Sequence, residues 1–287
     1  MDVPAPLARS AALLRCPVCQ GQLRVVARSL VCEHRHTYDV AKQGHVTLAR
    51  ATPAAGDDAE MVAARVAVFG AGHYAPLTSA LAHAARERVA RGGGGDSPAG
   101  PVVLDLGAGT GHHLAGVLDA LPGALGIALD TSRPALRHAV RAHADIAAVV
   151  ADVWQPLPVA DAAIELVLDV FSPRNGAEMA RVLKPGGAAL VVIPTAEHLA
   201  ELADLHDVKV DPEKVERLER TVGTHLERQA REPVRWTMHL TAEEVAAVLK
   251  MSPAGAHRRR DEPPRAAAVT GSVELWRLSK PETRASP

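Results

Sequence analysis

The architecture follows from one run, Val102-Val-Leu-Asp-Leu-Gly-Ala-Gly-Thr-Gly111, in which apolar residues lead directly into a loop with three glycines. The apolar part predicts a buried strand over 102–106. The glycines allow a tight turn and a close approach of the backbone to a ligand, and a helix is expected to begin immediately afterwards. The run differs from the dinucleotide-binding fingerprint, which has a glycine where this chain has His112.

Strands and helices alternate on the C-terminal side of this loop. We expect further strands over 125–129, 147–150, 164–170 and 188–193, and helices notably over 112–120 and 134–143. Because these strands are apolar almost throughout, they predict a parallel sheet that is covered on both faces. Two more strands are expected over 234–240 and 272–278, on either side of a helix over 242–249. The predicted fold class is therefore α/β.

Two acidic residues stand where the next two expected strands end. Asp130 follows Gly111 by nineteen residues and ends the second strand, where a carboxylate can accept hydrogen bonds from both hydroxyls of a ribose. Asp152 ends the third strand, where an acid typically meets an adenine amine. Together with the glycine loop and the run Leu183-Lys-Pro-Gly-Gly187, they predict a Rossmann-like class I domain of the S-adenosylmethionine (SAM)-dependent methyltransferases; an NAD-type or degenerate fold is the alternative. The residues expected to line the cofactor site are Asp105, Gly107, Gly109, Gly111, Asp130 and Asp152.

A second motif lies upstream, where all three cysteines of the chain fall within the first 32 residues. The run Cys16-Pro-Val-Cys19 is followed by Cys32-Glu-His-Arg-His36, so three thiolates and one imidazole have the spacing of ligands to a tetrahedral Zn²⁺ ion. Four protein ligands leave no open position on the metal, so the site is expected to be structural. His34 is a competing fourth ligand, and a redox dithiol at Cys16 and Cys19 is the rival interpretation.

Charge and composition limit the partners and the cellular location that the chain can be expected to have. The formal net charge is −1, which argues against a general polyelectrolyte-binding protein, but residues 1–50 carry seven Lys or Arg against three Asp or Glu. A basic zinc module suits a local phosphate contact; a merely solvated surface, or a module that only supports its neighbours, is the plainer alternative. The sequence shows no run of about 20 apolar residues, no signal-peptide pattern and no disulfide framework, so we expect a cytoplasmic protein.

The chain is expected to consist of three parts. These are a zinc-binding RNA-recognition module over 10–50, a linker with helices over 51–98, and a SAM-dependent methyltransferase domain over 99–287. Short strands are expected over 23–26, 30–31 and 45–48, and helices over 59–68 and 76–91, before a glycine-rich break at 92–98. A polar, charged region over 196–232 predicts helix, and the basic segment 257–264 predicts a loop.

The fourth expected strand ends in Leu168-Asp-Val-Phe-Ser-Pro-Arg174. In SAM methyltransferases that act on nucleobases, this strand end holds the target base. Asp169 could accept from the base edge or take a proton from a ring N–H, and Phe171 could stack on the base. The plainer interpretation is that Asp169 caps a loop and that Phe171 belongs to the core. His112 and His113, at the start of the helix after the glycine loop, are expected to be neutral and exposed.

Nearly the whole chain resembles a known family, the 23S rRNA (guanine-N1)-methyltransferases, and within it the Gram-positive branch associated with resistance to tylosin and related macrolides. The resemblance rests on the cysteine–histidine knuckle, the glycine loop and short motifs along the chain. These motifs are Thr37-Tyr-Asp-Val-Ala-Lys-Gln-Gly44, Asp58-Ala-Glu-Met-Val-Ala-Ala-Arg65, Ala71-Gly-His-Tyr-Ala-Pro-Leu77, Val170-Phe-Ser-Pro-Arg174, Leu183-Lys-Pro-Gly-Gly187 and His198-Leu-Ala-Glu-Leu202. The chain departs from the family pattern over 254–265, which is unusually basic and proline-rich.

The resemblance implies a substrate and a set of residues. The substrate would be a guanine in a 23S rRNA hairpin that lines the peptide exit tunnel, methylated at N1, and members of the family commonly pair as dimers around an RNA cleft. The zinc ligands would be Cys16, Cys19, Cys32 and His36, and SAM would contact Tyr74, Gly109, Thr110 and His198. Two other function classes stay open, a methyltransferase that tailors small natural products and a non-catalytic RNA- or SAM-binding protein.

Overall fold

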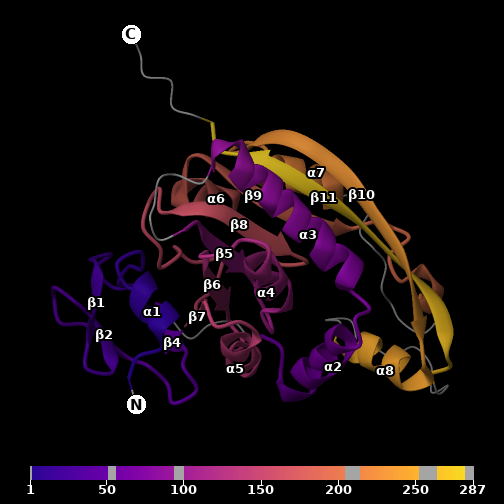
Figure 1. The fold of residues 1–287 in the computed structure, drawn as a ribbon, viewed down its shortest axis with the longest axis horizontal. Coiled ribbons are helices and arrows are strands. Elements are labelled where there is room, and N and C mark those ends of the chain that lie inside the picture. The colour runs from indigo at the N-terminus through magenta and orange to yellow at the C-terminus, as the bar shows by residue number, and fades with distance from the viewer. Residues whose placement is uncertain (1, 51–55, 94–99, 204–213, 252–263, 282–287) are drawn as a thin grey trace, which may run out of the picture.

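An eight-stranded sheet forms the centre of the protein (Figure 1). The computed structural model describes residues 2–50, 56–93, 100–203, 214–251 and 264–281. The strands follow each other across the sheet in the order β10-β11-β9-β8-β5-β6-β7-β4. Their bounds are Val46–Thr47 (β4), Val102–Leu106 (β5), Leu125–Asp130 (β6), Ile146–Val150 (β7), Ile164–Val170 (β8), Leu183–Pro194 (β9), Glu227–Leu240 (β10) and Ala267–Ser279 (β11). The strands from β4 to β9 pair in parallel, and β11 and β10 add an antiparallel edge.

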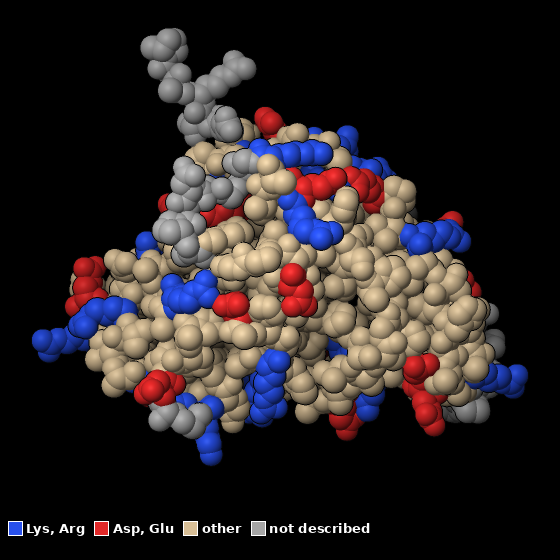
Figure 2. All heavy atoms as spheres, in the orientation of Figure 1, with Lys and Arg blue, Asp and Glu red and all other residues tan. Residues whose placement is uncertain are grey.

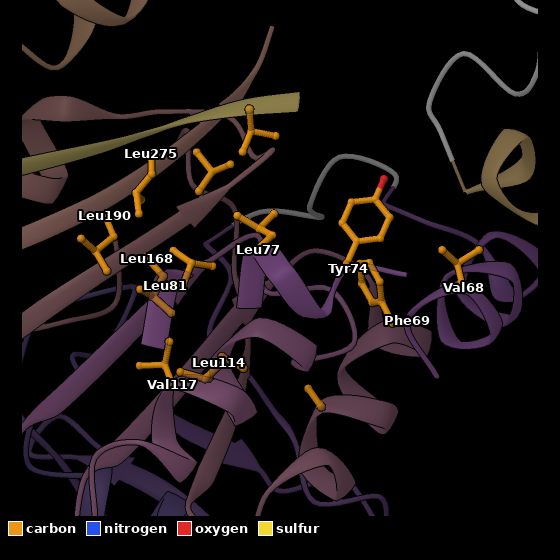
Figure 3. Packing of buried hydrophobic residues seen from close by; sticks show 14 of the residues in the cluster. Val68, Phe69, Tyr74, Leu77, Leu81, Leu114, Val117, Leu168, Leu190 and Leu275 are labelled. Atoms are coloured by element: carbon orange, nitrogen blue, oxygen red, sulfur yellow. The ribbon is translucent and has the colours of Figure 1, made fainter. Parts of the chain in front are cut away.

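One face of the sheet, here called the crossover face, is covered by helices that mostly connect consecutive strands. These helices are α2 (Ala59–Gly70), α3 (Ala75–Arg88), α4 (His112–Asp119), α5 (Arg133–Ala142) and α8 (Ala242–Lys250). Figure 3 shows Leu77 and Leu81 of α3 directed towards leucines of the sheet. Leu77, Leu81 and Leu114 are fully buried there, so this face holds one continuous apolar core.

The opposite face, here called the module face, is built differently. The connection from β7 to β8, residues 151–163, contains no helix. The short helix α1 (Ala5–Ser10) packs on β6 and β7 instead, and α6 (Gly176–Val182) and α7 (Lys214–Thr221) lie further along the sheet. Leu7 and Leu14 have no exposed surface in this core. The N-terminal segment with α1 therefore occupies the position that a crossover helix between β7 and β8 would take.

The N-terminal strands form a small sheet of their own. Strands β1 (Leu23–Val26), β2 (Ser29–Cys32) and β3 (Thr37–Asp39) pair antiparallel in that order. The next strand, β4, pairs in parallel with β7 of the large sheet. Backbone hydrogen bonds also join Arg15 to Pro158 and Leu13 to Ala160. The predicted division of the chain near residues 50 and 98 stays a prediction.

The predicted α/β fold class, a Rossmann-like sheet with a small N-terminal module, is confirmed. Several elements differ from the expectation. The helix expected up to residue 232 is wrong at its end, because β10 already begins at Glu227. Helix α1 and strand β3 were not expected, and the alternation of strands and helices fails between β7 and β8, where residues 151–163 form no helix. The expected loop over 257–264 lies outside the described residues except for its last residue, and no described helix is long and apolar enough to cross a membrane.

Candidate functional site

The glycine loop turns sharply between β5 and α4. Gly107, Gly109 and Gly111 all have positive φ, at 68°, 54° and 75°. Such values are strained for residues with a side chain, which explains the three glycines. A Cβ on Gly107 would lie 2.6 Å from the Cβ of Ser172, so the loop also needs glycine to pass the end of β8.

Asp130 holds this loop at the end of β6. Its Oδ2 accepts from the Gly109 amide at 2.8 Å, and its Oδ1 accepts from the Ser132 amide at 2.7 Å. Burial raises the pKa of the Asp130 carboxyl, while both amides act in the opposite direction. Asp105 is buried beneath the loop, and its pKa lies well above the usual range because of burial and the nearby carboxylates of Asp169 and Asp130. The predicted cofactor residues Asp105, Gly109 and Asp130 therefore lie together.

Asp152 lies two residues beyond the end of β7, and β7 is two strands away from β5. Its Oδ1 accepts from the Trp154 amide at 2.9 Å, which shapes the turn after the strand. The carboxylate is partly exposed. Asp130 and Asp152 thus stand at the carboxyl ends of neighbouring parallel strands, the edge at which open α/β sheets bind ligands.

An ion pair that the sequence did not reveal borders the glycine loop. The Arg65 guanidinium donates from Nε and Nη2 to Asp57 Oδ2, at 3.0 and 2.6 Å. Nη2 also donates to the Met251 carbonyl at 3.1 Å, and Ser132 Oγ donates to the Asp57 carbonyl at 2.6 Å. A Cβ on Gly109 would lie 3.7 Å from Arg65 Cδ. Arg65 belongs to one of the family-like motifs, which was the only signal of its position.

An aromatic cluster lies between α2, α3 and the sheet. It consists of Phe69, Tyr74, His112, His113, Phe171, His198 and Trp236. The Tyr74 ring is at its centre, with centroid distances of 5.6 Å to Trp236, 6.3 Å to His198 and 6.4 Å to Phe171. Figure 3 shows Tyr74 beside Phe69 at the corner between α2 and α3. The structure thus brings together the expected residues Tyr74, His198 and Phe171, and adds Trp236, whose Nε1 donates to the His73 carbonyl at 2.7 Å.

The two histidines after the glycine loop are less exposed than expected, and His112 is partly buried. His113 is buried rather than exposed, and its Nδ1 lies 2.9 Å from Thr78 Oγ1. Burial, with smaller contributions from His112 and Arg65, lowers the pKa of His113 to about 3. Burial also lowers the pKa of His112. Both imidazoles are therefore neutral at pH 7, as expected, and His112 stacks on Phe69 at 4.7 Å.

The end of β8 carries the expected acceptor residues. Asp169 has no exposed surface, and its Oδ1 lies 3.6 Å from Arg174 Nε, beyond hydrogen-bond distance. Burial raises the pKa of the Asp169 carboxyl to about 8, although the Arg174 charge acts in the opposite direction. Phe171 is 37 % exposed and has a φ of 57°, a strained value for this residue type. The strand end thus combines a buried carboxyl with an exposed ring.

The cysteine–histidine knuckle forms one cluster. One ligand atom from each of Cys16, Cys19, Cys32 and His36 lies within 4.8 Å of the others. The Cys19 and Cys32 sulfurs are 3.7 Å apart, and His36 Nδ1 is 3.5 Å from Cys16 Sγ and 3.3 Å from Cys32 Sγ. Tetrahedral zinc with bonds of about 2.3 Å to sulfur and 2.0–2.1 Å to nitrogen requires separations of roughly 3.5–3.8 Å. The donor set therefore fits Zn²⁺.

The knuckle also decides between the two histidines. His34 is turned outward, with a 63 % exposed side chain whose Nδ1 lies 3.8 Å from Glu33 Oε1. The Tyr38 hydroxyl lies 3.1 Å from Cys16 Sγ, close enough to donate to a thiolate. The geometry thus favours His36 over His34. It also brings all three thiols together, which a dithiol at Cys16 and Cys19 alone would not require.

The charged side chains are dispersed. On the face drawn in Figure 2, Lys and Arg alternate with Asp and Glu, and the described residues form no continuous basic field there. A polyanion would therefore be held on this face by local groups rather than by a broad electropositive surface.

Two family models match the chain. The zinc-ribbon model described as "RlmA, N-terminal" matches residues 14–50, and the model "Methyltransferase domain" matches residues 103–187. Among solved structures, a chain of the complex between the Haloferax volcanii Trm112 methyltransferase activator and a methyltransferase has a TM-score of 0.50 at 19 % identity. The match covers 80 % of this chain and 100 % of that one. It supports the fold alone.

Two relatives match over most of the chain. A protein of Streptomyces fradiae named 23S rRNA (guanine(748)-N(1))-methyltransferase is 45 % identical over 268 residues, which cover 93 % of this chain and 94 % of that protein. A protein of Micromonospora griseorubida, whose name gives 23S rRNA (guanine-N(1)-)-methyltransferase as a provisional assignment, is 47 % identical over 256 residues. That match covers 85 % of this chain and 87 % of the relative.

Proposed function

Because the chain belongs to the family of 23S rRNA (guanine-N1)-methyltransferases, we propose that it transfers a methyl group from SAM to N1 of a guanine in a 23S rRNA hairpin lining the peptide exit tunnel. The observation that carries the proposal is the 45 % identity with the Streptomyces fradiae enzyme across 93 % of the chain, which includes both the zinc module and the methyltransferase domain. Methylation at this tunnel would protect the ribosome from tylosin-type macrolides. Pairing of two copies around the RNA is carried over from the family as part of the same proposal, and a cytoplasmic location follows from the rRNA substrate.

The cofactor site is proposed to lie at the carboxyl edge of the sheet. When bound, SAM supplies a methyl group already activated by its sulfonium. Asp130 and Asp152 would accept from the ribose hydroxyls and the adenine amine, and the glycine loop gives the cofactor room. The remaining residues assigned to this site are Tyr74, Asp105, Gly107, Gly109, Thr110, Gly111 and His198. The Asp130–Gly109 hydrogen bond supports the assignment, because it couples the carboxylate to the loop.

The metal site is proposed to be structural. Cys16, Cys19, Cys32 and His36 would occupy all four positions of a Zn²⁺ ion, which leaves none for a substrate. The module would then act by holding RNA and by covering the sheet, and zinc would take no part in methyl transfer.

The acceptor needs help from the protein, because guanine N1 carries a proton at neutral pH. We assign Asp169 as the group that takes this proton and Phe171 as the ring that stacks on the base drawn out of the hairpin. Because the pKa of Asp169 is about 8, only the ionised fraction of the carboxyl can take this proton, so the methylation rate should rise with pH up to about 8. Asp169 is fully buried, so the role requires the loop after β8 to move when the base enters.

The test is a methylation assay on deproteinised 23S rRNA with tritiated SAM, followed by mass spectrometry of the nucleosides. We expect N1-methylguanosine, which also stops reverse transcription because N1 lies on the pairing edge. Asp169→Ala should lower the rate by about 10²–10⁴-fold, the usual contribution of a general base. Asp119→Ala, at a 74 % exposed carboxylate, is the matched control and should leave the rate unchanged.

Two results would contradict the proposal at different points. Near-normal methylation by Asp169→Ala would remove this residue from the mechanism while leaving the activity intact. Methyl on a ribose, on guanine N7 or on a protein would overturn the N1-guanine function itself. Tylosin tolerance of cells that express the chain, compared with cells that express Asp169→Ala, tests the resistance role.

A further inference from the structure

The few aromatic residues of this chain are distributed unevenly between core and surface. There are three Trp, two Tyr and two Phe, and all seven are described. Five of them are buried or partly buried, namely Tyr38, Phe69, Tyr74, Trp236 and Trp276. The other two are Trp154, 62 % exposed, and Phe171, 37 % exposed. Both exposed rings stand in loops at the carboxyl edge of the sheet, where the cofactor residues lie.

The loop that carries Trp154 is fixed on both sides of the exposed ring. The Val153 carbonyl accepts from Asn175 Nδ2 at 3.0 Å, which ties this loop to the one after β8 that contains Phe171. The Leu157 amide donates to Glu178 Oε2 at 2.6 Å. The Val153 and Leu157 side chains are buried. Because its neighbours on both sides are hydrogen-bonded and buried, the Trp154 ring is held in an exposed position by the structure of the loop.

Trp154 also lies between the cofactor edge and the zinc module. Its amide donates to Asp152, the carboxylate at the end of β7. Four residues further on, the Pro158 carbonyl accepts from the Arg15 amide, directly before the first cysteine of the knuckle. Four extended residues span at most about 14 Å, so Trp154 lies within that distance of the module.

We propose that Trp154 stacks on an unpaired nucleobase of the RNA substrate, next to the target guanine that Phe171 receives. Any base can stack on an aromatic ring, and loop bases of hairpins are free to do so. The exposed rings of Trp154 and Phe171, on two loops joined by a hydrogen bond, would hold two neighbouring bases apart and keep the hairpin loop open. This inference rests on the proposed RNA substrate.

The test compares the full-length protein with Trp154→Ala and Trp154→Phe on deproteinised 23S rRNA that lacks the methyl group. Trp154→Ala should weaken RNA binding roughly 5- to 100-fold, since one stacked base contributes about that much. Trp154→Phe should restore most of the affinity because it keeps a ring. The slope of affinity against salt concentration should be unchanged, because no charge is lost. SAM affinity, measured by calorimetry on the same samples, should also stay the same.

Fluorescence gives an independent measurement, because Trp236 and Trp276 are buried and Trp154 is the exposed indole. RNA should quench the wild-type signal and should quench the Trp154→Phe protein much less. Unchanged RNA affinity of Trp154→Ala, at normal zinc content and Tm, would overturn the inference. Weaker SAM binding with normal RNA binding would do so too, because the ring would then serve the adenine. If the wild type forms no N1-methylguanosine in the same assay, the proposed function fails instead.

Discussion

The two faces of the sheet are covered by different means. On the crossover face, helices α2 to α5 and α8 pack their apolar sides against the strands, as in other doubly wound sheets. On the module face, the β7–β8 connection supplies no helix; α1 packs on β6 and β7, and the cysteine–histidine knuckle belongs to the same apolar cluster. The knuckle residues Cys16 and Cys32 belong to the same apolar core as Leu104 and Leu129 of the sheet. The apolar core of the module is thus continuous with that of the sheet.

Removal of zinc should have the largest effect on the module face, and it tests whether this face depends on the metal. Structural zinc binding contributes on the order of 10 kcal/mol to folding, and each kcal/mol shifts Tm by about 2–4 °C in a protein of 150–250 residues. We therefore expect Cys32→Ser, or chelation, to lower Tm by more than about 10 °C and to expose the module face to apolar dyes. Val18→Ala, at a 56 % exposed position of the knuckle, is the control. If the zinc-free protein unfolded at the wild-type Tm, the module would be separable from the sheet.

A second test changes the contact between α1 and the sheet without touching the metal. Leu7 is fully buried on the module face, so Leu7→Ala should lower the free energy of unfolding by about 2–5 kcal/mol. Leu13→Ala, at a partly buried position, should cost less. Urea unfolding can be followed through the fluorescence of Trp276, which is buried in the same core. Two separate transitions, with only the first moved by Leu7→Ala, would argue against a shared core.

The smallest expected effect concerns buried carboxyls, of which the sheet has one on each face near the glycine loop. Asp105 lies two residues after Val103 and therefore on the same, crossover face of β5. Asp169 lies two residues after Val167 and therefore on the module face of β8. The folded-state pKa of Asp169 is about 8, against about 3.9 in an unfolded chain. Between these values the unfolded state releases a proton that the folded state keeps, so stability falls as pH rises from about 4 to 8.

Asp169→Asn removes this ionisation and should reduce the fall. We expect its Tm to exceed that of the wild type by more at pH 8 than at pH 5.5, measured by calorimetry in the same buffers. Asp105 should maintain part of the pH dependence, because its pKa is also raised. An identical loss of Tm with pH in both proteins would mean that Asp169 is ionised in the folded state.

The sequence predicted the parts of the fold that local patterns determine. Strands β5 and β8 begin and end where expected, and the apolar run of β5 is bounded by Pro101 and Gly107. The strand expected over 234–240 is too short, because β10 begins at Glu227. The residues from 227 onward include many exposed charged side chains, which made this part resemble a polar helix. Helix α1 was missed because six residues show too little periodicity, and its apolar side makes sense only against β6 and β7, more than 100 residues away.

The candidate site was predictable to a similar degree. Glycines, strand-end carboxylates and knuckle ligands have fixed spacings, so Gly109, Asp130 and Cys32 could be identified from the chain alone. The Arg65–Asp57 pair beside the glycine loop could not, because it is brought there by the packing of α2 against other helices and by the hydrogen bond from Ser132 to Asp57. The full burial of Asp169 was equally invisible, since alternation indicates the face of a strand but not what covers it.

The position of α1 also affects the order in which the protein can be assembled. The α1 residue Arg9 pairs with Asp145, 136 residues later, and Leu14 bridges Val159. At a synthesis rate of about 5–20 residues per second, the first segment made must wait on the order of ten seconds for the strands it covers. The knuckle ligands lie within 21 residues of one another and can capture their metal during this interval. An early zinc-bound module would then present a preformed apolar surface, onto which the sheet condenses as it leaves the ribosome.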